Sequence, residues 1–554
     1  MMDKQELYEI IEHKQAEVLD LSDKIWGYAE LSMLEYKSTA AYVELMKKEG
    51  FQVTENLCGI PTAFSGSYGE GSPRIGILGE YDALSGLSQE SGAAEKKPLV
   101  EDGCGQGCGH NLLGAASLSA AIAIKDAIKA GKLHGTVIFY GCPGEEGCAG
   151  KTFMARDGLF KDLDAAITWH PGDTNEVTTG SNAACMQFVY EFEGVAAHAA
   201  GNPWEGRSAL DGAEMMNMGV QFLREHMEPK CSIHYSIADA GGISPNVVQP
   251  KAKLIYMVRA ETVRKAKALL ARVNDIAKGA ALMSGTTVTW HQLDGTADTI
   301  SNTVLEELLY ENLQEAPLPE YTQQEWDFAE TLRKTYPHEG LPGNGVDSNP
   351  VLKKEVSKLS DQGRKAINDF VVPYYPSSFY SPGSTDVGDV SWLTPTAQFN
   401  AAAWPSQVPG HSWQVVSIGK SGQAHKALNY AAKVLAGAAA DLMEKPEILK
   451  KNGTYGVRLK AGAPSIHMMR VDIDTEIAPM VGDEQQSREL ISFLQGEDPE
   501  KLWGSNIFGK SVDLIQEGLN AKLVRLPEDV RGKFRGTLTR IVNEGATGLV
   551  CLIL

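Results

Sequence analysis

The chain has 554 residues, a formal net charge of −20 and 43% hydrophobic residues, which is enough apolar material for several packed cores. The negative charge argues against nucleic acid or an anionic membrane as a partner, because both surfaces would repel it. Eight scattered cysteines favour a reducing compartment over a disulfide-stabilised secreted fold. We therefore expect a cytoplasmic protein with no membrane span.

The first half of the chain alternates between strands and helices. Residues 1–26 are charged, with apolar side chains at helical spacing, and this favours an amphipathic helix over a signal peptide. Further along, the sequence predicts strands at 74–79, 136–140 and 165–169, and helices at 112–130 and 151–157. This alternation predicts a mostly parallel sheet, which binds ligands beyond the carboxyl ends of its strands.

The pattern changes near residue 182. Predicted strands at 189–193, 253–259 and 286–290, with helices at 209–225 and 263–283, indicate an inserted α+β unit. The sequence predicts an irregular segment with short helices at 317–382. It then predicts a helix at 422–443 that packs in the core of the first domain. After residue 450 we expect an extended segment at 466–477, helices at 484–494 and 530–542, and a strand at 549–554.

These elements predict an α/β protein with three structural parts. The parts are a catalytic domain in two stretches, 1–182 and 300–450, an inserted lid and dimerisation domain at 183–299, and a small α+β module at 451–554.

Glu145 and Glu146 form the most informative pair in the chain, in a glycine-rich turn directly after the strand at 136–140. Adjacent carboxylates repel each other unless a cation or a shared proton stabilises them. Cys108 and His110 lie upstream, and His170 follows another apolar run. Together these residue types suit two borderline divalent ions such as zinc or manganese.

Each residue has a simpler reading when taken alone. The loop with Cys108 and His110 could be a tight turn, His170 a strand-end histidine and His411 a turn residue. Cys104 and Cys108 leave a structural zinc knuckle as an alternative, although no second pair lies at a suitable spacing.

Several motifs carry a family resemblance over residues 1 to about 450. They are GEYDAL at 79–84, GCGHN at 107–111, CPGEE at 142–146, WHP at 169–171, AHA at 197–199, the segment 241–248 with Arg259, GSTD at 383–386 and HSWQ at 411–414. In this order they resemble the aminoacylase and amidohydrolase family of dinuclear metallopeptidases, and most closely its aminobenzoyl-glutamate hydrolases.

The resemblance implies a set of roles around two divalent ions, manganese or zinc. The implied metal ligands are Cys108, His110, Glu146, His170 and His411. Glu145 would be the general base, and Asp82 would orient the neighbouring ligands. Glu80 stands where many relatives carry a metal-binding histidine, so it is left out of the ligand set.

The resemblance also implies roles for the inserted domain. His198 would reach an active site, often that of a partner subunit, and stabilise the tetrahedral intermediate. Asn246 and Arg259 would bind the terminal carboxylate of the substrate. The simpler readings are a small-residue turn for His198 and a surface ion pair for Arg259.

The implied activity is metal-dependent hydrolysis of the amide bond of an N-acyl amino acid, with aminobenzoyl-glutamate as the favoured case. A broader aminoacylase or dipeptidase is the alternative within this class. The implied assembly is a homodimer or a hetero-oligomer with a related subunit.

The C-terminal module carries a second resemblance. NGTYGV at 452–457, APSIHMM at 463–469 and SNIFGK at 505–510 resemble the C-terminal end of the stage IV sporulation protein A family, whose members are spore-coat morphogenetic ATPases. Only that end is present, so the ATPase activity is not carried over. The resemblance implies contact with a spore coat. It also leaves a non-enzymatic alternative, in which the protein is an assembly scaffold.

Overall fold

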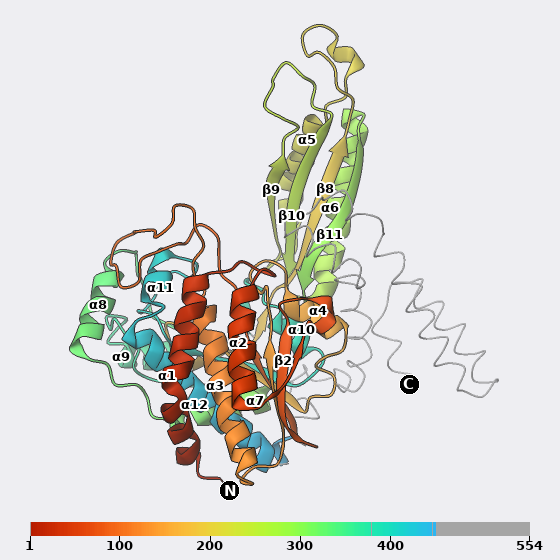
Figure 1. Cartoon of the computed structure of the whole chain (residues 1–554). Helices are drawn as coiled ribbons and strands as arrows, with labels where there is room; N and C mark the ends of the chain where they lie inside the picture. The colour runs from red at the N-terminus through yellow and green to blue at the C-terminus, as the bar shows by residue number, and fades with distance from the viewer. Residues whose placement is uncertain (1, 378, 446, 450–554) are drawn as a thin grey trace, which may run out of the picture. The chain divides into compact units, whose positions relative to one another are not determined.

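The computed structural model describes residues 2–377, 379–445 and 447–449 (Figure 1). The predicted module at 451–554, with its segments at 466–477, 484–494, 530–542 and 549–554, lies outside the described residues. The described chain forms two compact units. Among the described residues, unit 1 comprises the chain up to Gly180, Ile300–Phe379 and the chain from Val390 to Leu449, and unit 2 comprises Ser181–Thr299 and Tyr380–Asp389.

Unit 1 is built on a seven-stranded sheet with the order β1-β2-β4-β3-β5-β13-β6. The strands are β1 (Gln52–Glu55), β2 (Phe64–Glu70), β3 (Arg74–Gly79), β4 (Gly135–Gly141), β5 (Ala165–Gly172), β6 (Glu176–Val177) and β13 (Thr396–Ala402). The central strands β4, β3, β5 and β13 pair in parallel, and antiparallel strands flank them. The prediction of a mostly parallel sheet is therefore confirmed.

Ten helices accompany this sheet in the described chain. They are α1 (Lys4–Tyr28), α2 (Tyr36–Glu49), α3 (His110–Lys129), α4 (Gly150–Arg156), α7 (Thr303–Glu315), α8 (Gln323–Arg333), α9 (Pro350–Leu359), α10 (Val387–Ser391), α11 (Trp413–Ile418) and α12 (Gly422–Glu444). The last two residues of α10 belong to unit 1. The alanine-rich helices α3 and α12 contact each other and the sheet, and α1 packs on both (Figure 1). Their small side chains allow this close approach, which buries most of α3 and α12.

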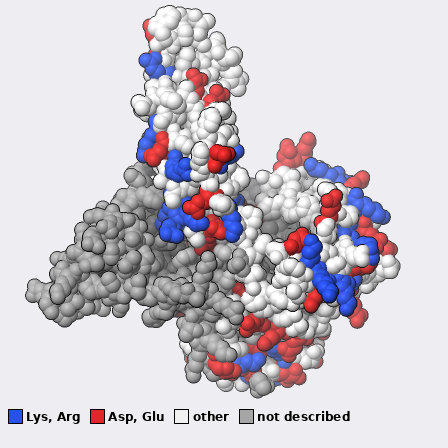
Figure 2. Space-filling model, turned by 180° about the vertical axis from the view of Figure 1, so that it is seen from behind, with Lys and Arg blue, Asp and Glu red and all other residues white. Residues whose placement is uncertain are grey.

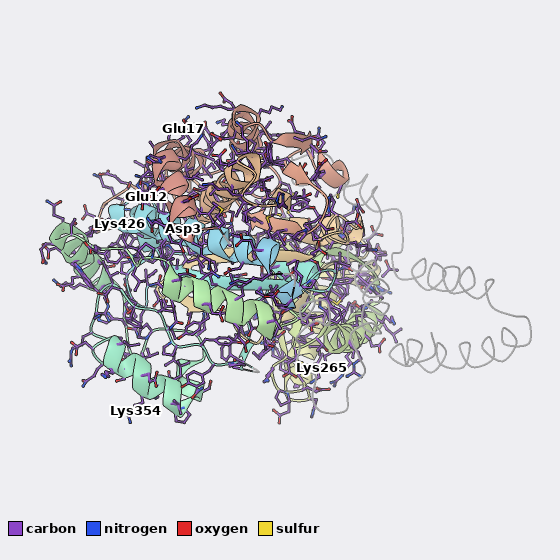
Figure 3. All side chains as sticks on the ribbon, turned by 90° about the horizontal axis from the view of Figure 1, so that it is seen from below. Asp3, Glu12, Glu17, Lys265, Lys354 and Lys426 are labelled. Carbon is purple, nitrogen blue, oxygen red and sulfur yellow. The ribbon has the colours of Figure 1, made fainter. Side chains whose placement is uncertain are left out.

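The ends and outer faces of these helices carry polar contacts. Asp3, labelled in Figure 3, caps α1 by accepting a 3.0 Å hydrogen bond from the backbone N–H of Gln5. Glu12 of α1 pairs with Lys433 of α12 at 2.7 Å, and Lys426 of α12 pairs with Glu325 at 2.6 Å (Figure 3). These contacts fix the helices around the apolar core.

Helix α3 has the length and hydropathy of a membrane-spanning segment, and it is the one such helix among the described residues. Inside unit 1, however, 89% of its apolar window is buried against other parts of the protein. Its composition is therefore that of a core helix.

Unit 2 is a four-stranded antiparallel sheet with the order β11-β8-β10-β9. Its strands are β8 (Ala184–Glu193), β9 (Ser232–Asp239), β10 (Lys251–Ala260) and β11 (Thr287–Thr296), and its helices are α5 (Ala209–Arg224) and α6 (Val263–Ser284). The two helices pack together and cover the buried side of β10 and β8. The short strands β7 (Ser181–Asn182) and β12 (Tyr380–Ser381) pair in parallel beside it.

Five strands of these sheets, β1, β2, β6, β9 and β13, were not predicted, and two of them show why. β13 pairs with β5 more than 220 residues away in sequence, so no local pattern announces it. β9 is an edge strand, and most of its side chains are exposed, so it lacks the apolar alternation of a half-buried strand.

Candidate active site

The chemically important side chains of unit 1 gather at one edge of its parallel sheet. Glu80 and Asp82 directly follow β3, the turn with Glu145 and Glu146 follows β4, and His170 lies near the end of β5. Because β4, β3 and β5 run parallel, their carboxyl ends meet at the same edge.

The loop before α3 adds Cys108 and His110 to this edge. Gly109, at φ +75°, is the N-cap of α3, and its Cα lies so close to Pro171 and Trp404 that an added Cβ would sit 3.2 to 3.3 Å from them. Only glycine adopts this conformation without strain, so it lets the two flanking side chains turn toward β5.

His411 joins the group from a distant loop. Its backbone N–H donates a 3.1 Å hydrogen bond to the carbonyl oxygen of Gly107, which ties its loop to the loop of Cys108. His411 itself has φ +53°, a conformation that non-glycine residues rarely adopt and that is concentrated at functional sites.

Three groups of side chains could each hold a metal ion, with their ligand atoms within 4.8 Å of one another. They are Cys108 with His110 and His170, Cys108 with Glu146 and His411, and Glu80 with His110 and Glu145. The structure thus brings together all five predicted ligands, and it adds Glu80 and Glu145 to their surroundings.

The spacing of the ligand atoms fits metal coordination. The Sγ of Cys108 lies 3.3 Å from Nε2 of His170, and Nε2 of His411 lies 3.4 Å from Oε1 of Glu146. Donor atoms that share one zinc-like ion at about 2.1 Å each are roughly 3.4 Å apart at a tetrahedral angle. The thiol, imidazole and carboxylate donors also match borderline divalent metals.

Two buried polar atoms reinforce this fit. Nε2 of His110 and Oε1 of Glu146 make no hydrogen bond within the described residues. A buried polar atom without a partner is costly, and both atoms face other ligands of the group. A bound cation would satisfy both of them.

Asp82 orients the side chain of His110 and the turn of Glu146. Its Oδ1 lies 2.8 Å from Nδ1 of His110, and its Oδ2 accepts hydrogen bonds from Ser32 Oγ at 2.8 Å and from the backbone N–H of Glu146 at 2.9 Å. Burial acts to raise the pKa of Asp82, but these hydrogen bonds and His110 lower it below its ordinary value. Asp82 is therefore a carboxylate that directs Nε2 of His110 toward the other ligands.

Burial also shifts the protonation of the ligands themselves. It raises the pKa of the Cys108 thiol far above its ordinary value, although the charge of His110 opposes this shift. It lowers the pKa of His170, and His110 acts in the same direction. A neutral His170 can donate its lone pair to a metal, whereas Cys108 needs a nearby cation to become a thiolate.

In unit 2, His198 and Asn246 lie on paired loops beyond one end of the sheet, at the Glu193 and Lys251 ends of β8 and β10. The Ala199 N–H donates a 3.0 Å hydrogen bond to the Asn246 carbonyl oxygen. Nδ1 of the exposed His198 accepts from the N–H groups of Ala200 and Gly201 at 3.2 and 3.1 Å. A neutral His198 therefore carries its proton on Nε2, where it can be donated.

Arg259 lies at the opposite end of the same sheet, where β10 pairs with Cys185 of β8. Its guanidinium donates a 2.6 Å hydrogen bond to Oγ of Ser384. Between Lys251 and Arg259, β10 extends roughly 26 Å at about 3.3 Å per residue. Within unit 2 of a single chain, Arg259 therefore lies far from both Asn246 and His198.

Sequence reasoning left Glu80 out of the ligand set and passed over Lys151 and Glu35. Glu80 and Lys151 form a buried ion pair of 2.6 Å, and Glu35 accepts a hydrogen bond from the Gly144 N–H. A lysine five residues after Glu146, on the first turn of a helix, was the available signal for Lys151. Glu35 had no sequence signal, because it comes from a surface-like charged stretch.

Comparison with known proteins covers both parts of the chain. Family models described as "Stage IV sporulation protein A, middle domain" and "Sporulation stage IV protein A, C-terminal" match residues 427–482 and 483–554. Stage IV sporulation protein A of Bacillus subtilis is 47% identical over 22% of this chain. The match spans 26% of that relative, so the whole relative's activity does not follow from it.

The C-terminal module contains one motif that sequence reasoning missed. GSNIFGKS at 504–511 has the Gly-x4-Gly-Lys-Ser spacing of a phosphate-binding loop. The sequence before it, DPEKLW at 498–503, lacks the apolar run that is typical of the strand before such a loop. The spacing alone is therefore weak evidence for nucleotide binding.

The larger part of the chain matches one enzyme family. The model "Peptidase family M20/M25/M40" matches residues 76–399. One of the subunits of the p-aminobenzoyl-glutamate hydrolase of Escherichia coli is 40% identical over 81% of this chain and 94% of the relative. The solved aminobenzoyl-glutamate utilization protein from Klebsiella pneumoniae shares the fold, with a TM-score of 0.52 and 15% identity over 78% of this chain and 98% of that one. The chain therefore belongs to peptidase family M20/M25/M40 and is a metal-dependent hydrolase that carries a C-terminal segment related to stage IV sporulation protein A.

Proposed function

We propose that this hydrolase cleaves the amide bond of N-acyl amino acids, with p-aminobenzoyl-glutamate as the substrate and p-aminobenzoate and glutamate as the products. The observation that carries the proposal is the convergence of thiol, imidazole and carboxylate donors around the turn of Glu145 and Glu146. The 40% identity to a subunit of a p-aminobenzoyl-glutamate hydrolase supports this substrate.

In this proposal two divalent ions, manganese or zinc, are held by Cys108, His110, Glu146, His170 and His411. When bound, such ions lower the pKa of a coordinated water toward neutrality and polarise the scissile carbonyl. Asp82 keeps the proton of His110 on Nδ1, so that Nε2 faces the centre.

Glu145 is the proposed general base. It lies beside Glu146 in the turn after β4, and it offers a carboxylate oxygen within 4.8 Å of ligand atoms of Glu80 and His110. In the first step it accepts a proton from the attacking water, and in the second it returns that proton to the nitrogen of the leaving amine. The proton balance is closed, because the amine leaves neutral and the acid leaves as a carboxylic acid that ionises in water.

Arg259 and its partner Ser384 are proposed to bind the α-carboxylate of the amino-acid half of the substrate. A planar guanidinium suits a carboxylate, and a protein of net charge −20 needs a local cation to hold an anion. The short Arg259–Ser384 hydrogen bond of 2.6 Å holds the guanidinium in place.

We further propose that His198 and Asn246 act in the active site of a second subunit. A substrate of one acyl group and one amino acid is much shorter than the span of β10, so Arg259 and His198 of one chain cannot both touch it. The loop end of unit 2 carries few charged side chains (Figure 2), and Trp204 and Ile243 there are 72% and 100% exposed. A homodimer, or a hetero-oligomer with a related subunit, would cover this surface and deliver Nε2–H of His198 to the oxyanion.

The rest of the proposal concerns organisation and place in the cell. Boundaries at residues 182, 299 and 450 divide the chain into four stretches, which form the catalytic domain, the lid and the sporulation-related module. The few, scattered cysteines of the sequence support a cytoplasmic location. The module after residue 450 would contact a spore coat. The alternative function that this module supports is an assembly scaffold whose hydrolase domain is inactive.

The test is an amidase assay on the full chain with defined substrates. We expect hydrolysis of p-aminobenzoyl-glutamate that a chelator abolishes and that added manganese or zinc restores. The α-amide of the same substrate, and acyl dipeptides, separate a carboxylate-requiring hydrolase from a broader dipeptidase. Arg259→Ala should raise KM about 100-fold for the free acid and little for the amide. A chain that binds no metal and cleaves none of these amides would be a scaffold.

A further inference from the structure

Lys151 is a fully buried ammonium that the proposed reaction does not use. It lies on the first turn of α4, directly after the turn of Glu145 and Glu146, and its side chain is 0% exposed. Its Nζ lies 2.6 Å from Oε1 of Glu80, which is 3% exposed. Burying both charges is costly, so this pair requires a reason beyond stability.

The second oxygen of Glu80 points at the metal centre. Oε2 of Glu80 lies 3.2 Å from Nε2 of His110. Asp82 lies at Nδ1 of His110, so a neutral, metal-binding imidazole would present its lone pair at Nε2. A cation bound by this nitrogen and by Oε2 of Glu80 would hold the two atoms at this distance.

The distance between the two atoms is that of two ligands on one ion. Atoms bound to a common divalent metal at about 2.1 Å are roughly 3.0 Å apart at a right angle and roughly 3.4 Å apart at a tetrahedral angle. The observed 3.2 Å falls between these limits. It also matches the 3.3 Å between the Cys108 and His170 ligand atoms of the same centre.

We propose that Glu80 is a further metal ligand that binds through Oε2 alone, and that Lys151 is the positioning residue that fixes it. Lys151 holds Oε1, so Glu80 cannot chelate the ion with both oxygens or rotate away from it. Its positive charge also offsets part of the negative charge that a thiolate and several carboxylates bring to the centre. The inference rests on the metal centre of the proposed function and assigns two residues that the predicted ligand set lacked.

The variants Glu80→Gln and Lys151→Met test the proposal by metal binding rather than by turnover. The full chain is stripped with a chelator and titrated with Co²⁺, while the visible absorption bands and the bound metal after dialysis are measured. We expect Glu80→Gln to lower the affinity for one of the two Co²⁺ ions by about 100-fold and to change the absorption bands of that ion. Lys151→Met should lower the affinity for the same ion by about 10-fold, because it removes a residue that orients a ligand.

Lys125→Met is the matched control. Lys125 is 3% exposed and pairs with Glu49 at 2.8 Å, but it lies about 22 Å along α3 from His110 at 1.5 Å per residue. This variant removes an equally buried ammonium and should bind both ions as the unchanged protein does. Equal weakening in Lys125→Met and Lys151→Met would overturn the role of Lys151.

The double variant Glu80→Gln with Lys151→Met covers the case in which a single variant leaves an unpaired buried charge and does not fold. It removes both charges together, and we expect it to lose the same ion as Glu80→Gln. If the folded double variant, or Glu80→Gln itself, binds two Co²⁺ ions with unchanged affinity and bands, Glu80 is no ligand. Hydrolysis by the unchanged protein would then still support the proposed function, so the two failures are distinguishable.

Discussion

Glu35 accepts a 2.8 Å hydrogen bond from the backbone N–H of Gly144, the residue that precedes Glu145 in the turn after β4. The same oxygen accepts the N–H of Met33 at 2.9 Å. Burial, reinforced by the charge of Asp82, raises the pKa of Glu35 to about 8. A buried acid from the N-terminal segment therefore anchors the turn that holds the proposed base.

Removing this anchor should affect catalysis more than binding. We expect Glu35→Ala to lower kcat by about 100-fold with little change in KM, because a misplaced base loses its reach to the water. Glu35→Gln retains a carbonyl oxygen for both N–H groups and should keep kcat within about fivefold. Steady-state kinetics checks both, and an equal loss in the two variants would show that the carboxyl acts in some other way.

The neighbouring glutamates should differ in metal content. Glu145→Gln is expected to lower kcat by about 100- to 10,000-fold while both ions stay bound, since its role is proton transfer. Glu146→Gln should lose metal, because its Oε1 faces His411 within a ligand group. Elemental analysis beside kinetics makes the comparison, with Glu311→Gln on the exposed side of α7 as the control. The same metal content in both variants would refute the assignment.

The distance between His198 and Arg259 predicts complementation. His198→Ala and Arg259→Ala should each be nearly inactive alone. A mixed dimer combines an intact Arg259 with an intact His198 at one of its two sites. Half of the dimers that form at random from the two variants are mixed. Unfolding and refolding the two variants together should therefore restore about a quarter of the activity of the unchanged protein. Mixtures no more active than the separate variants would place both residues in one site or remove one of them from it.

The C-terminal module should be separable from the chemistry. Every proposed ligand and Glu145 precede residue 450, and α12 ends at Glu444. A chain that ends at Lys450 is therefore expected to bind two metal ions and to keep kcat/KM within about fivefold, while residues 452–554 alone should fold or self-associate without metal. Loss of all hydrolysis in the shortened chain, with an unfolded fragment, would show that the module is part of the catalytic domain.

Glu306 predicts a pH dependence of stability away from the metal centre. Burial raises its pKa from an ordinary 4.5 to about 7, and the hydrogen bond from the Tyr374 hydroxyl opposes this shift. Between these two values the folded protein holds a proton that the unfolded chain releases, so the contribution of Glu306 to stability falls as pH rises through this window.

Glu306→Gln should remove this dependence, because the amide resembles the protonated acid and can still accept from Tyr374. We expect its melting temperature to equal that of the unchanged protein near pH 4.5 and to exceed it by about 2–4 °C at pH 8. Thermal unfolding over this pH range provides the measurement. A difference that is the same at every pH would mean that Glu306 does not titrate there.

The sequence by itself determined the local elements and the chemistry they carry. The strand at 74–79 and the helix near 112–130 follow from apolar runs and periodicity, and Cys108, His110 and the Glu145 turn stood out because their residue types are those that metals bind. These signals are local, so they are visible without knowing what packs against them.

Only the tertiary structure decided the relationships between distant segments. The pairing of β13 with β5, the contact of Lys151 with Glu80 and the separation of Arg259 from His198 along β10 depend on which surfaces meet. Glu80 shows the consequence. In the sequence it departs from a familiar ligand pattern, whereas in the fold a buried ammonium holds one of its oxygens and turns the other toward His110. Long-range contacts of this kind are selected by packing and by the cost of burying charge, which no short stretch of sequence encodes.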